Sequence, residues 1–330
     1  MKLKLILLAA VVALNAVVLV GCADRNTSND EKQNYDAPAT EKSLPEANSA
    51  EDFEYEQYEN DTGTAIMITD YTGSAAEVVI PKEIEGLTVR KIGINAFMDN
   101  TEITSVTIPD SVTEIDNYTF VRCTSLTSIN IPYGVTEIGD GAFYDCIALT
   151  SVTIPDSVTV IGSRAFSGCT GLTSIAIPDS VTSLKGFDGC TGLTSVTIPD
   201  SVIHLGGFSD CTGLTSVIIP DSVVYVGASA FSGCTGLTSV TIGSGVTEID
   251  GYAFVECSGL TSVIIPDSVS VIRHHAFFRC SNLTSVTIPA SVTEIEISFA
   301  GECPNLTIQC PSGSAAEQYA IENEIPYTII

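Results

Sequence analysis

The chain has 330 residues, and its 40 acidic and 13 basic residues give a net charge of −27. This balance argues against a nucleic-acid partner, because binding phosphates depends on lysine and arginine. With three histidines and no P-loop, dinucleotide fingerprint or G-x-S-x-G sequence, the chain is predicted to be neither an enzyme nor a cofactor-binding protein.

Residues 1–21 are predicted to be a targeting segment. Two lysines precede an apolar run that is short for a membrane span and is interrupted by Asn15. The segment ends in Leu19-Val20-Gly21-Cys22, which is similar to a bacterial lipobox. We therefore expect a lipoprotein signal peptide and a membrane anchor of two or more acyl chains on Cys22. A plain signal peptide or a transmembrane helix is the alternative.

Residues 22–50 are predicted to be a disordered linker between this anchor and the folded part. The segment is rich in Asn, Asp, Glu, Ser, Thr and Pro and has no apolar period. Cleavage after residue 21 would remove two lysines and lower the net charge from −27 to −29. Such an acidic surface suits solubility or a basic partner.

The rest of the chain is organised by one repeated stretch. A single copy runs from Leu149 to Gly171 and reads LTSVTIPDSVTVIGSRAFSGCTG, and Leu172 begins the next copy. From Pro109 to Pro289 the step is 23 residues, except for two steps of 21 between Pro178 and Pro220. A fixed period of this length indicates a stacked repeat architecture. Each copy is too short to bury its own apolar side chains, so neighbouring copies must bury them together.

The pattern within a copy predicts which side chains form the core. Val152 and Ile154 alternate with Ser151 and Thr153, so the apolar pair faces inward and the hydroxyl pair outward. Proline then ends the strand, because it cannot donate a ladder hydrogen bond. One repeat position always carries phenylalanine, which predicts a continuous column along the core. Its members are Phe97, Phe120, Phe143, Phe166, Phe187, Phe208, Phe231, Phe254, Phe277 and Phe299.

The repeated pattern L-x-x-V-x-I-P-x-x-V-x-x-I-x-x-x-A-F-x-x-C resembles the leucine-rich repeat of BspA-like bacterial surface proteins. The resemblance covers about residues 53–330 and implies a right-handed, mostly β leucine-rich-repeat solenoid. It places parallel strands on the concave face and turns with short helical segments on the convex side. We expect an N-terminal cap with the first turn over residues 51–97, repeats over 98–311 and a helix-strand cap over 312–330.

Nine cysteines share one repeat position, and Cys310 lies in the last strand. We predict that they are free, buried and packed as small hydrophobes. Disulfides or a metal site are the alternatives, but nine residues in one column leave one unpaired, and no C-x-x-C sequence occurs. The nine are Cys123, Cys146, Cys169, Cys190, Cys211, Cys234, Cys257, Cys280 and Cys303.

Aspartate occupies the turn after six of the predicted strands, and stacking would place neighbours about 5 Å apart. A solvated acidic row is the expectation. Calcium bound by this row is the alternative, although a calcium site needs about six to eight oxygens. The aspartates in question include Asp156, Asp179, Asp200 and Asp221.

The outward side chains of the strands form a face that is nearly free of charge, and we predict that a partner binds there. Strand propensity alone also explains threonine at such positions. Ile218 and Ile264 interrupt the hydroxyl rows as exposed apolar residues. The candidate binding residues are Ser151, Thr153, Ser174, Ser195, Thr197, Ser216, Ile218, Ser239, Thr241 and Ile264.

The family resemblance implies surface attachment, so we expect a lipid-anchored protein of the bacterial envelope. It would bind a protein of the host matrix or of another bacterial surface. A structural envelope scaffold is the alternative, and an ice-binding role fits poorly with a curved face and an anchor. The two short repeats lack two residues each before Phe187 and Phe208. They predict a shallow depression or altered curvature around Lys185, Gly186, Gly206 and Gly207, with the strand register intact.

Overall fold

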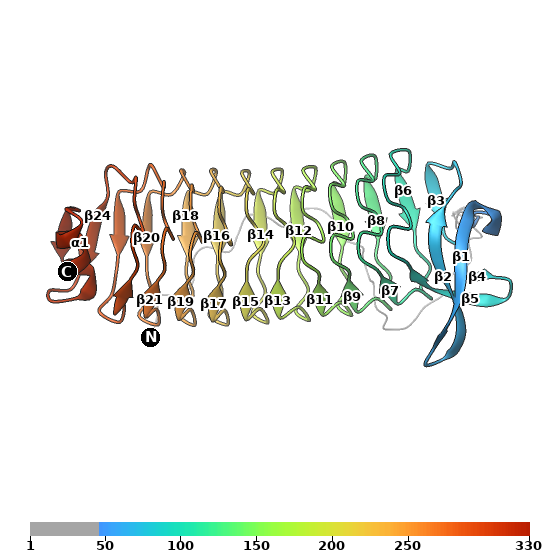
Figure 1. Ribbon diagram of the computed structural model, residues 1–330, viewed down its shortest axis with the longest axis horizontal. Helices are drawn as coiled ribbons and strands as arrows, with labels where there is room; N and C mark the ends of the chain where they lie inside the picture. Colours follow the sequence, from blue (N-terminus) through green and yellow to red (C-terminus); the bar gives the residue numbers. More distant parts are fainter. Residues whose placement is uncertain (1–45) are drawn as a thin grey trace, which may run out of the picture. The chain divides into compact units, whose positions relative to one another are not determined.

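The repeats stack into a mostly β solenoid of about 11 turns, in which each turn contributes one three-residue and one two-residue strand (Figure 1). The computed structural model describes residues 46–330. The predicted signal peptide, Cys22 and nearly all of the predicted linker lie outside the described residues. No helix within residues 46–330 is long and apolar enough to cross a membrane.

The three-residue strands pair in parallel along one side of the coil, with Ser opposite Ser in successive turns. They form four separate sheets, ordered β10-β8-β6-β3, β12-β14, β16-β18 and β20-β22-β24-β25. These strands are β3 (Glu77–Val79), β6 (Ser105–Thr107), β8 (Ser128–Asn130), β10 (Ser151–Thr153), β12 (Ser174–Ala176), β14 (Ser195–Thr197), β16 (Ser216–Ile218), β18 (Ser239–Thr241), β20 (Ser262–Ile264) and β22 (Ser285–Thr287), continued by the longer β24 (Thr307–Cys310).

The two-residue strands form a second parallel row. They fall into two sheets, and the row is interrupted between β11 and β13, where the short turns begin. The strands are β7 (Glu114–Ile115), β9 (Glu137–Ile138), β11 (Val160–Ile161), β13 (Ser183–Leu184), β15 (His204–Leu205), β17 (Tyr225–Val226), β19 (Glu248–Ile249), β21 (Val271–Ile272) and β23 (Glu294–Ile295).

A hairpin closes the N-terminal end of the solenoid. A 3-10 turn, η1 (Ala50–Asp52), leads into β1 (Phe53–Asn60), which pairs antiparallel with β2 (Gly63–Tyr71). The short β4 (Glu83–Ile84) folds back on β5 (Leu87–Ile92). Asn48 belongs to this cap, because its Oδ1 accepts the Val79 N–H at 2.7 Å. The folded unit therefore starts a few residues before the expected boundary at 51.

The interior consists of columns of identical side chains, as the repeat predicts. Consecutive phenylalanine rings from Phe97 to Phe277 lie 4.8 to 5.6 Å apart between centroids. Tyr71 extends the stack at the N-terminal end at 5.4 Å. All ten predicted column phenylalanines are at most 1% exposed. Phe299 is nevertheless not part of the stack, because it lies four positions before its cysteine, whereas the eight phenylalanines from Phe120 to Phe277 lie three before theirs. Because each ring is covered by the turns on both sides, no single turn can form this core alone.

The loops between the two-residue strands and the phenylalanine column are hydrogen-bonded turns and contain no helical segment within residues 46–330. In the regular turns from Phe97 to Phe277 a residue with positive φ lies two positions before the phenylalanine, and another follows two positions after it. Tyr118 and Arg122 around Phe120, with φ of 58° and 57°, are examples. A left-handed residue cannot continue a right-handed helix, which explains why the expected helical segments are absent.

The two short turns keep the core and change the loop. Gly186 and Gly207, directly before Phe187 and Phe208, adopt φ values of 103° and 75°. A Cβ at Gly207 would lie 2.4 Å from the Gly186 nitrogen, so neither the conformation nor the space suits a side chain. The strand register continues through these turns, with Ser174 opposite Ser195 and Ser183 opposite His204. The prediction of an intact register is confirmed.

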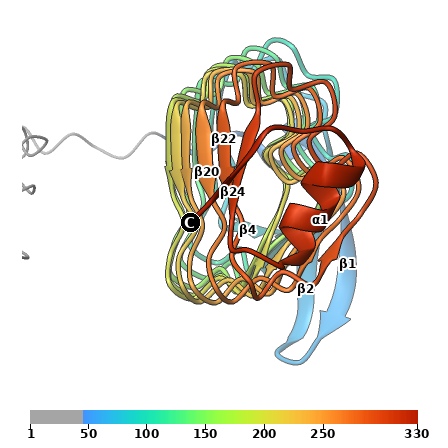
Figure 2. The ribbon, with the colours of Figure 1, turned by 90° about the vertical axis from the view of Figure 1, so that its left-hand side faces the viewer.

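The C-terminal cap is a helix followed by a strand, as expected. The helix α1 (Ala315–Glu322) begins at Ser314, whose side chain accepts the Glu317 N–H, and β25 (Tyr327–Ile329) then pairs in parallel with β24. Tyr319 of α1 packs edge-on against Phe299 with 5.1 Å between centroids. Viewed along the solenoid, α1 lies on the side opposite strands β20, β22 and β24 (Figure 2).

Candidate functional site

The candidate site is the strand face, which we define as the outward side chains of the three-residue strands and β24 from Ser105 to Gln309. All ten predicted binding residues are exposed there. From β6 to β24 this face carries no charged side chain. Ile218 and Ile264 are each 69% exposed and lie opposite Thr241 and Thr287 of the next turn. The face therefore offers hydroxyl rows with two apolar projections.

A ladder of threonines fixes one edge of the strand face. The Thr127 hydroxyl donates to the Thr104 carbonyl at 3.0 Å, and the same contact recurs one turn later between Thr150 and Thr127 at 3.3 Å. These threonines precede the strands and use their hydroxyl groups within the fold. Within the described turns the outward Thr153, Thr197 and Thr241 have no such hydrogen bond, so their hydroxyls remain free for a partner.

The strand face is hollowed where the ladder between β14 and β16 is interrupted. A hollow of about 480 Å³ opens there, lined by Thr197, Ile218 and Thr241 together with Val196 and Pro220. Val196 is partly exposed at this interruption, whereas the equivalent Val217 of the next turn is 2% exposed. Three of the predicted binding residues thus meet at one concavity, which repeat spacing alone does not predict.

The aspartate row beside the strand face lies at the surface of the turns. Asp156, Asp179, Asp200 and Asp221 are all exposed. Asp221 Oδ1 accepts the backbone N–H of Ser244 at 2.7 Å, and this hydrogen bond lowers the pKa of its carboxyl group. Across residues 46–330 no three His, Cys, Asp or Glu side chains converge as metal ligands would. The geometry therefore does not support the calcium alternative.

The cysteine column belongs to the core and offers no reactive group. Ten cysteines in the described part are free thiols, and all but the half-buried Cys303 are buried. Each column thiol donates to a phenylalanine carbonyl of the preceding turn, such as Cys169 to Phe143 at 3.2 Å. Burial raises the pKa of the Cys123 thiol to about 12, and burial acts in the same direction along the column. The free, packed arrangement predicted from the sequence is confirmed.

A second hollow lies at the two short turns, on the side of the two-residue strands. It measures about 460 Å³ and is lined by Lys185, Gly206 and Gly207 together with Asp188, His204 and Tyr225. The depression predicted around the short turns is confirmed. His204 is exposed and occupies the strand position that Tyr225 and Glu248 hold in the next two turns. The roles of Asp188 and Tyr225 were missed, because neither interrupts the repeat pattern.

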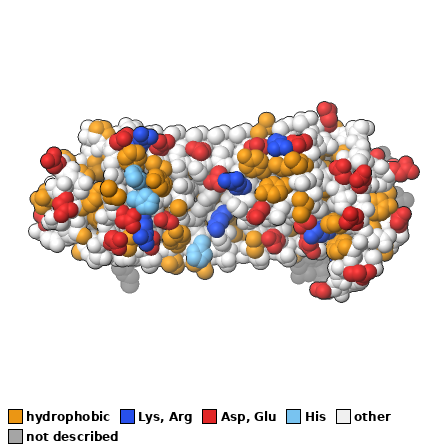
Figure 3. Space-filling view, in the orientation of Figure 1, with side chains coloured by type: hydrophobic (Ala, Val, Ile, Leu, Met, Phe, Trp, Pro, Cys, Tyr) orange, Lys and Arg blue, Asp and Glu red, His pale blue; other side chains and the backbone are white. Residues whose placement is uncertain are grey.

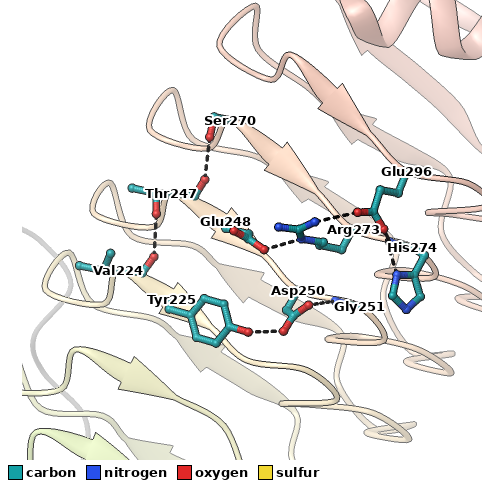
Figure 4. Close-up of polar contacts among 10 residues, drawn as sticks. All are labelled: Val224, Tyr225, Thr247, Glu248, Asp250, Gly251, Ser270, Arg273, His274 and Glu296. Carbon is teal, nitrogen blue, oxygen red and sulfur yellow. Dashed lines mark hydrogen bonds and ion pairs between the residues drawn. The ribbon is translucent and has the colours of Figure 1, made fainter.

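A group of charged residues follows the two-residue strands further along (Figure 4). The Arg273 guanidinium contacts Glu248 at 2.5 Å and Glu296 at 2.9 Å, and His274 Nδ1 lies 2.9 Å from Glu296. Hydrogen bonds from His274 and then Arg273 lower the pKa of Glu296 to about 2. Tyr225 donates to Asp250 in the same region. These contacts link successive turns of the solenoid.

Comparison with known proteins gives a family for this architecture. The family model described as a BspA type leucine rich repeat region matches residues 90–212 and 203–325, with six copies. No curated protein matches the chain.

Several solved structures are similar. A leucine rich repeat protein of T. pallidum is 27% identical, covering 72% of this chain and 91% of its own, with a TM-score of 0.49. A leucine rich cell surface protein from Faecalibacterium prausnitzii is 29% identical, covering 84% and 98%, with a TM-score of 0.43. A leucine-rich repeat protein from Bacteroides ovatus is 23% identical, covering 84% and 98%, with a TM-score of 0.41.

Proposed function

Because the chain belongs to the BspA-type leucine-rich repeat family of bacterial surface proteins, we propose that it is an adhesion or protein-binding module that uses its strand face. Leucine-rich repeat families are generally non-enzymatic binding scaffolds, and we propose no catalysis for this chain. Solenoids commonly bind along such extended surfaces, because side chains of many turns are presented in rows.

The observation that carries the proposal is the exposure of Ile218 and Ile264 on an otherwise uncharged face. Each is 69% exposed although isoleucine is usually buried. Interfaces place apolar anchors in a centre that excludes charge and surround it with polar groups. Ile218 lies at the rim of the 480 Å³ hollow, with Thr197 and Thr241 beside it. A partner side chain could enter this hollow while its backbone bonds the neighbouring hydroxyls.

The acidic turns beside the strand face favour a basic partner. Asp156, Asp179 and Asp200 are exposed along one edge, and an array of like charges raises the association rate of an oppositely charged protein. Exposed charges are screened within about 8–10 Å at ordinary ionic strength. The association rate should therefore fall with added salt, while contacts at Ile218 and the threonines should be less affected. The partner is a protein of the host matrix or of another bacterial surface.

The proposal places the module at the bacterial envelope through a lipid on Cys22. The lipobox-like Leu19-Val20-Gly21-Cys22 supports this assignment, and acyl chains on a mature N-terminal cysteine would give stable attachment. Cys22→Ala should release the protein from membranes or leave the precursor uncleaved. Intact-mass analysis of the membrane fraction tests this, and an unmodified Cys22 would refute the anchor.

Substitutions on the strand face test the binding proposal. Thr153, Thr197, Ile218 and Thr241 are each replaced by Lys or Glu, and adhesion to host matrix and to neighbouring bacteria is measured. These side chains are exposed, so binding should be lost while the thermal transition is retained. Ile297→Glu is the matched control, because Ile297 is 75% exposed and lies in the loop after β23, away from the strand face.

Two results would contradict the proposal. Adhesion that survives all four substitutions, or that requires residues 22–50 alone, would place the binding site elsewhere. A pull-down that recovers no partner from matrix or bacteria would favour the structural scaffold instead.

A further inference from the structure

The hollow at the two short turns has the size and walls of a small-molecule site. Its volume of about 460 Å³ falls within the roughly 300–1,000 Å³ of typical ligand pockets. Two consecutive turns each lack two residues before the phenylalanine, while the flanking turns keep theirs. Ser163 on one side and Ala228 and Ser229 on the other therefore form walls around a floor of glycine backbone.

The glycines at the bottom of the hollow, Gly186, Gly206 and Gly207, permit close approach of a flat ligand. Gly186 and Gly207 cannot carry a side chain, because an added Cβ would lie 2.8 Å and 2.4 Å from backbone atoms. Gly206 differs, since an added Cβ there would meet nothing within 4 Å and its φ is not positive. The space above Gly206 is therefore open to a ligand.

The hollow contains an unpaired cation. Lys185 occupies the repeat position that Arg273 holds four turns later, but the same position carries Gly162 in the preceding turn and Gly206 in the following one. Arg273 forms an ion pair with Glu296 of the next turn, whereas Lys185 makes no ion pair within residues 46–330. Its ammonium group is free to donate to a ligand.

A half-buried carboxylate faces the same space. Asp188 Oδ1 accepts the Ser209 N–H at 3.0 Å, and its other oxygen has no hydrogen-bond partner in the described chain. Burial raises the pKa of Asp188, although Arg164 nearby acts in the opposite direction. A carboxylate in this position accepts hydrogen bonds from ligand hydroxyls, and it repels anions such as phosphate.

An aromatic ring completes the wall. The Tyr225 hydroxyl donates to Asp250, which fixes the ring in place, and His204 meets the ring edge-on at 6.5 Å. A fixed aromatic ring presents an apolar surface at little entropic cost. Leu205 is the other large apolar side chain in the lining, but it is only 2% exposed, so an apolar ligand would have little to contact besides the Tyr225 ring.

From this combination we infer that the hollow binds one uncharged sugar unit of a glycan. A sugar ring offers apolar C–H groups to Tyr225 and a rim of hydroxyls that both donate and accept. Asp188 accepts from these hydroxyls, Lys185 donates to them, and the serine hydroxyls of the walls do either. Acidic sugars meet repulsion from Asp188 and basic sugars from Lys185, so a neutral ring fits best. This site is separate from the strand face and does not depend on its function.

Saturation-transfer NMR on the folded protein tests the inference with glucose, galactose and N-acetylglucosamine as neutral probes. Glucuronic acid, glucosamine and inorganic phosphate are the charged comparisons. We expect transfer to at least one neutral sugar, with contacts strongest on one ring face. Gly206→Trp should weaken that binding at least about tenfold by filling the hollow. Asp188→Asn should weaken it about tenfold, as expected for loss of a charge-assisted hydrogen bond.

Matched controls separate a lost site from a damaged fold. Ser174→Trp adds the same side chain on the strand face, and Asp179→Asn removes an exposed turn carboxylate; both should bind the sugar like the unmodified protein. Melting curves of all four variants should coincide. The inference is overturned if no neutral sugar shows transfer, if a charged probe binds better, or if folded Gly206→Trp binds as well as the unmodified protein.

Discussion

The regular turns and the two short turns have the same interior and different surfaces. Phe187 and Phe208 stack 5.4 Å apart, within the range of the regular turns. Cys190 and Cys211 still donate to the phenylalanine of the preceding turn, although the sequence separation falls from 26 to 24 residues. The deletion is taken up entirely by the loop before the phenylalanine. A stacked core thus tolerates loss of surface residues, and the lost volume becomes a hollow.

The largest effect should come from breaking the phenylalanine column. Phe166→Ala in a regular turn and Phe208→Ala in a short turn should each lower the free energy of unfolding by about 3–5 kcal/mol, because each leaves a buried cavity. Chemical denaturation gives the values, and hydrogen exchange should show the damage concentrated in adjoining turns. A clearly smaller effect for Phe208→Ala would mean that the short turns do not share the regular core.

A smaller effect is expected in the cysteine column. Cys169→Ala removes the donor to the Phe143 carbonyl, but that carbonyl also accepts the Cys146 N–H at 3.2 Å. The expected loss is therefore about 1–2 kcal/mol, and Cys190→Ala in a short turn should match it. In a thiol titration without reductant, these cysteines should be unreactive in the folded protein and reactive in the denatured protein. A thiol count near zero after denaturation would show disulfides instead.

The ion pairs of the regular turns should give a modest pH dependence that the short turns lack. Because the pKa of Glu296 is lowered from 4.5 to about 2, its contribution to stability is present above pH 4.5 and is lost as the pH falls toward 2. The Glu296 and Arg273 side chains keep 26% and 37% of their surface exposed, so solvent screening should keep the effect on the melting temperature small. Glu296→Gln should melt lower than the unmodified protein at neutral pH and approach it near pH 2. A difference in melting temperature between the two proteins that stays constant from neutral pH to about pH 2 would show that the lowered pKa of Glu296 does not contribute to stability.

Restoring the missing residues should have the smallest effect on stability. Replacing Lys185-Gly186 and Gly206-Gly207 with the Gly-Ser-Arg-Ala loop of residues 162–165 should change the free energy of unfolding by less than about 1 kcal/mol. Sugar binding should disappear and adhesion through the strand face should remain. Denaturation and the two binding assays measure these outcomes. Marked destabilisation would show that the glycine loops are required by the core.

The repeat pattern was sufficient to predict the parts that every turn shares. The phenylalanine and cysteine columns, the outward Ser and Thr rows and the exposed Ile218 follow from stacking identical units. The interruption between β14 and β16 does not follow, because the turns on either side of it have nearly the same sequence as turns whose strands pair. Tyr225 with Asp250 and Asp188 with Ser209 were also unpredictable, since each pair joins residues of different turns that no motif connects.

Site-specific photo-crosslinking tests most directly whether the strand face is the binding surface. A benzophenone amino acid is placed at Ile218 or at Ile297, two isoleucines of similar exposure, 69% and 75%, in different parts of the turn. Each protein is irradiated while bound to host matrix or neighbouring bacteria, and crosslinked partners are identified by mass spectrometry. We predict that a specific partner is crosslinked from position 218 and that none is crosslinked from position 297. Crosslinks from position 297 alone, or equal yields from both, would contradict it.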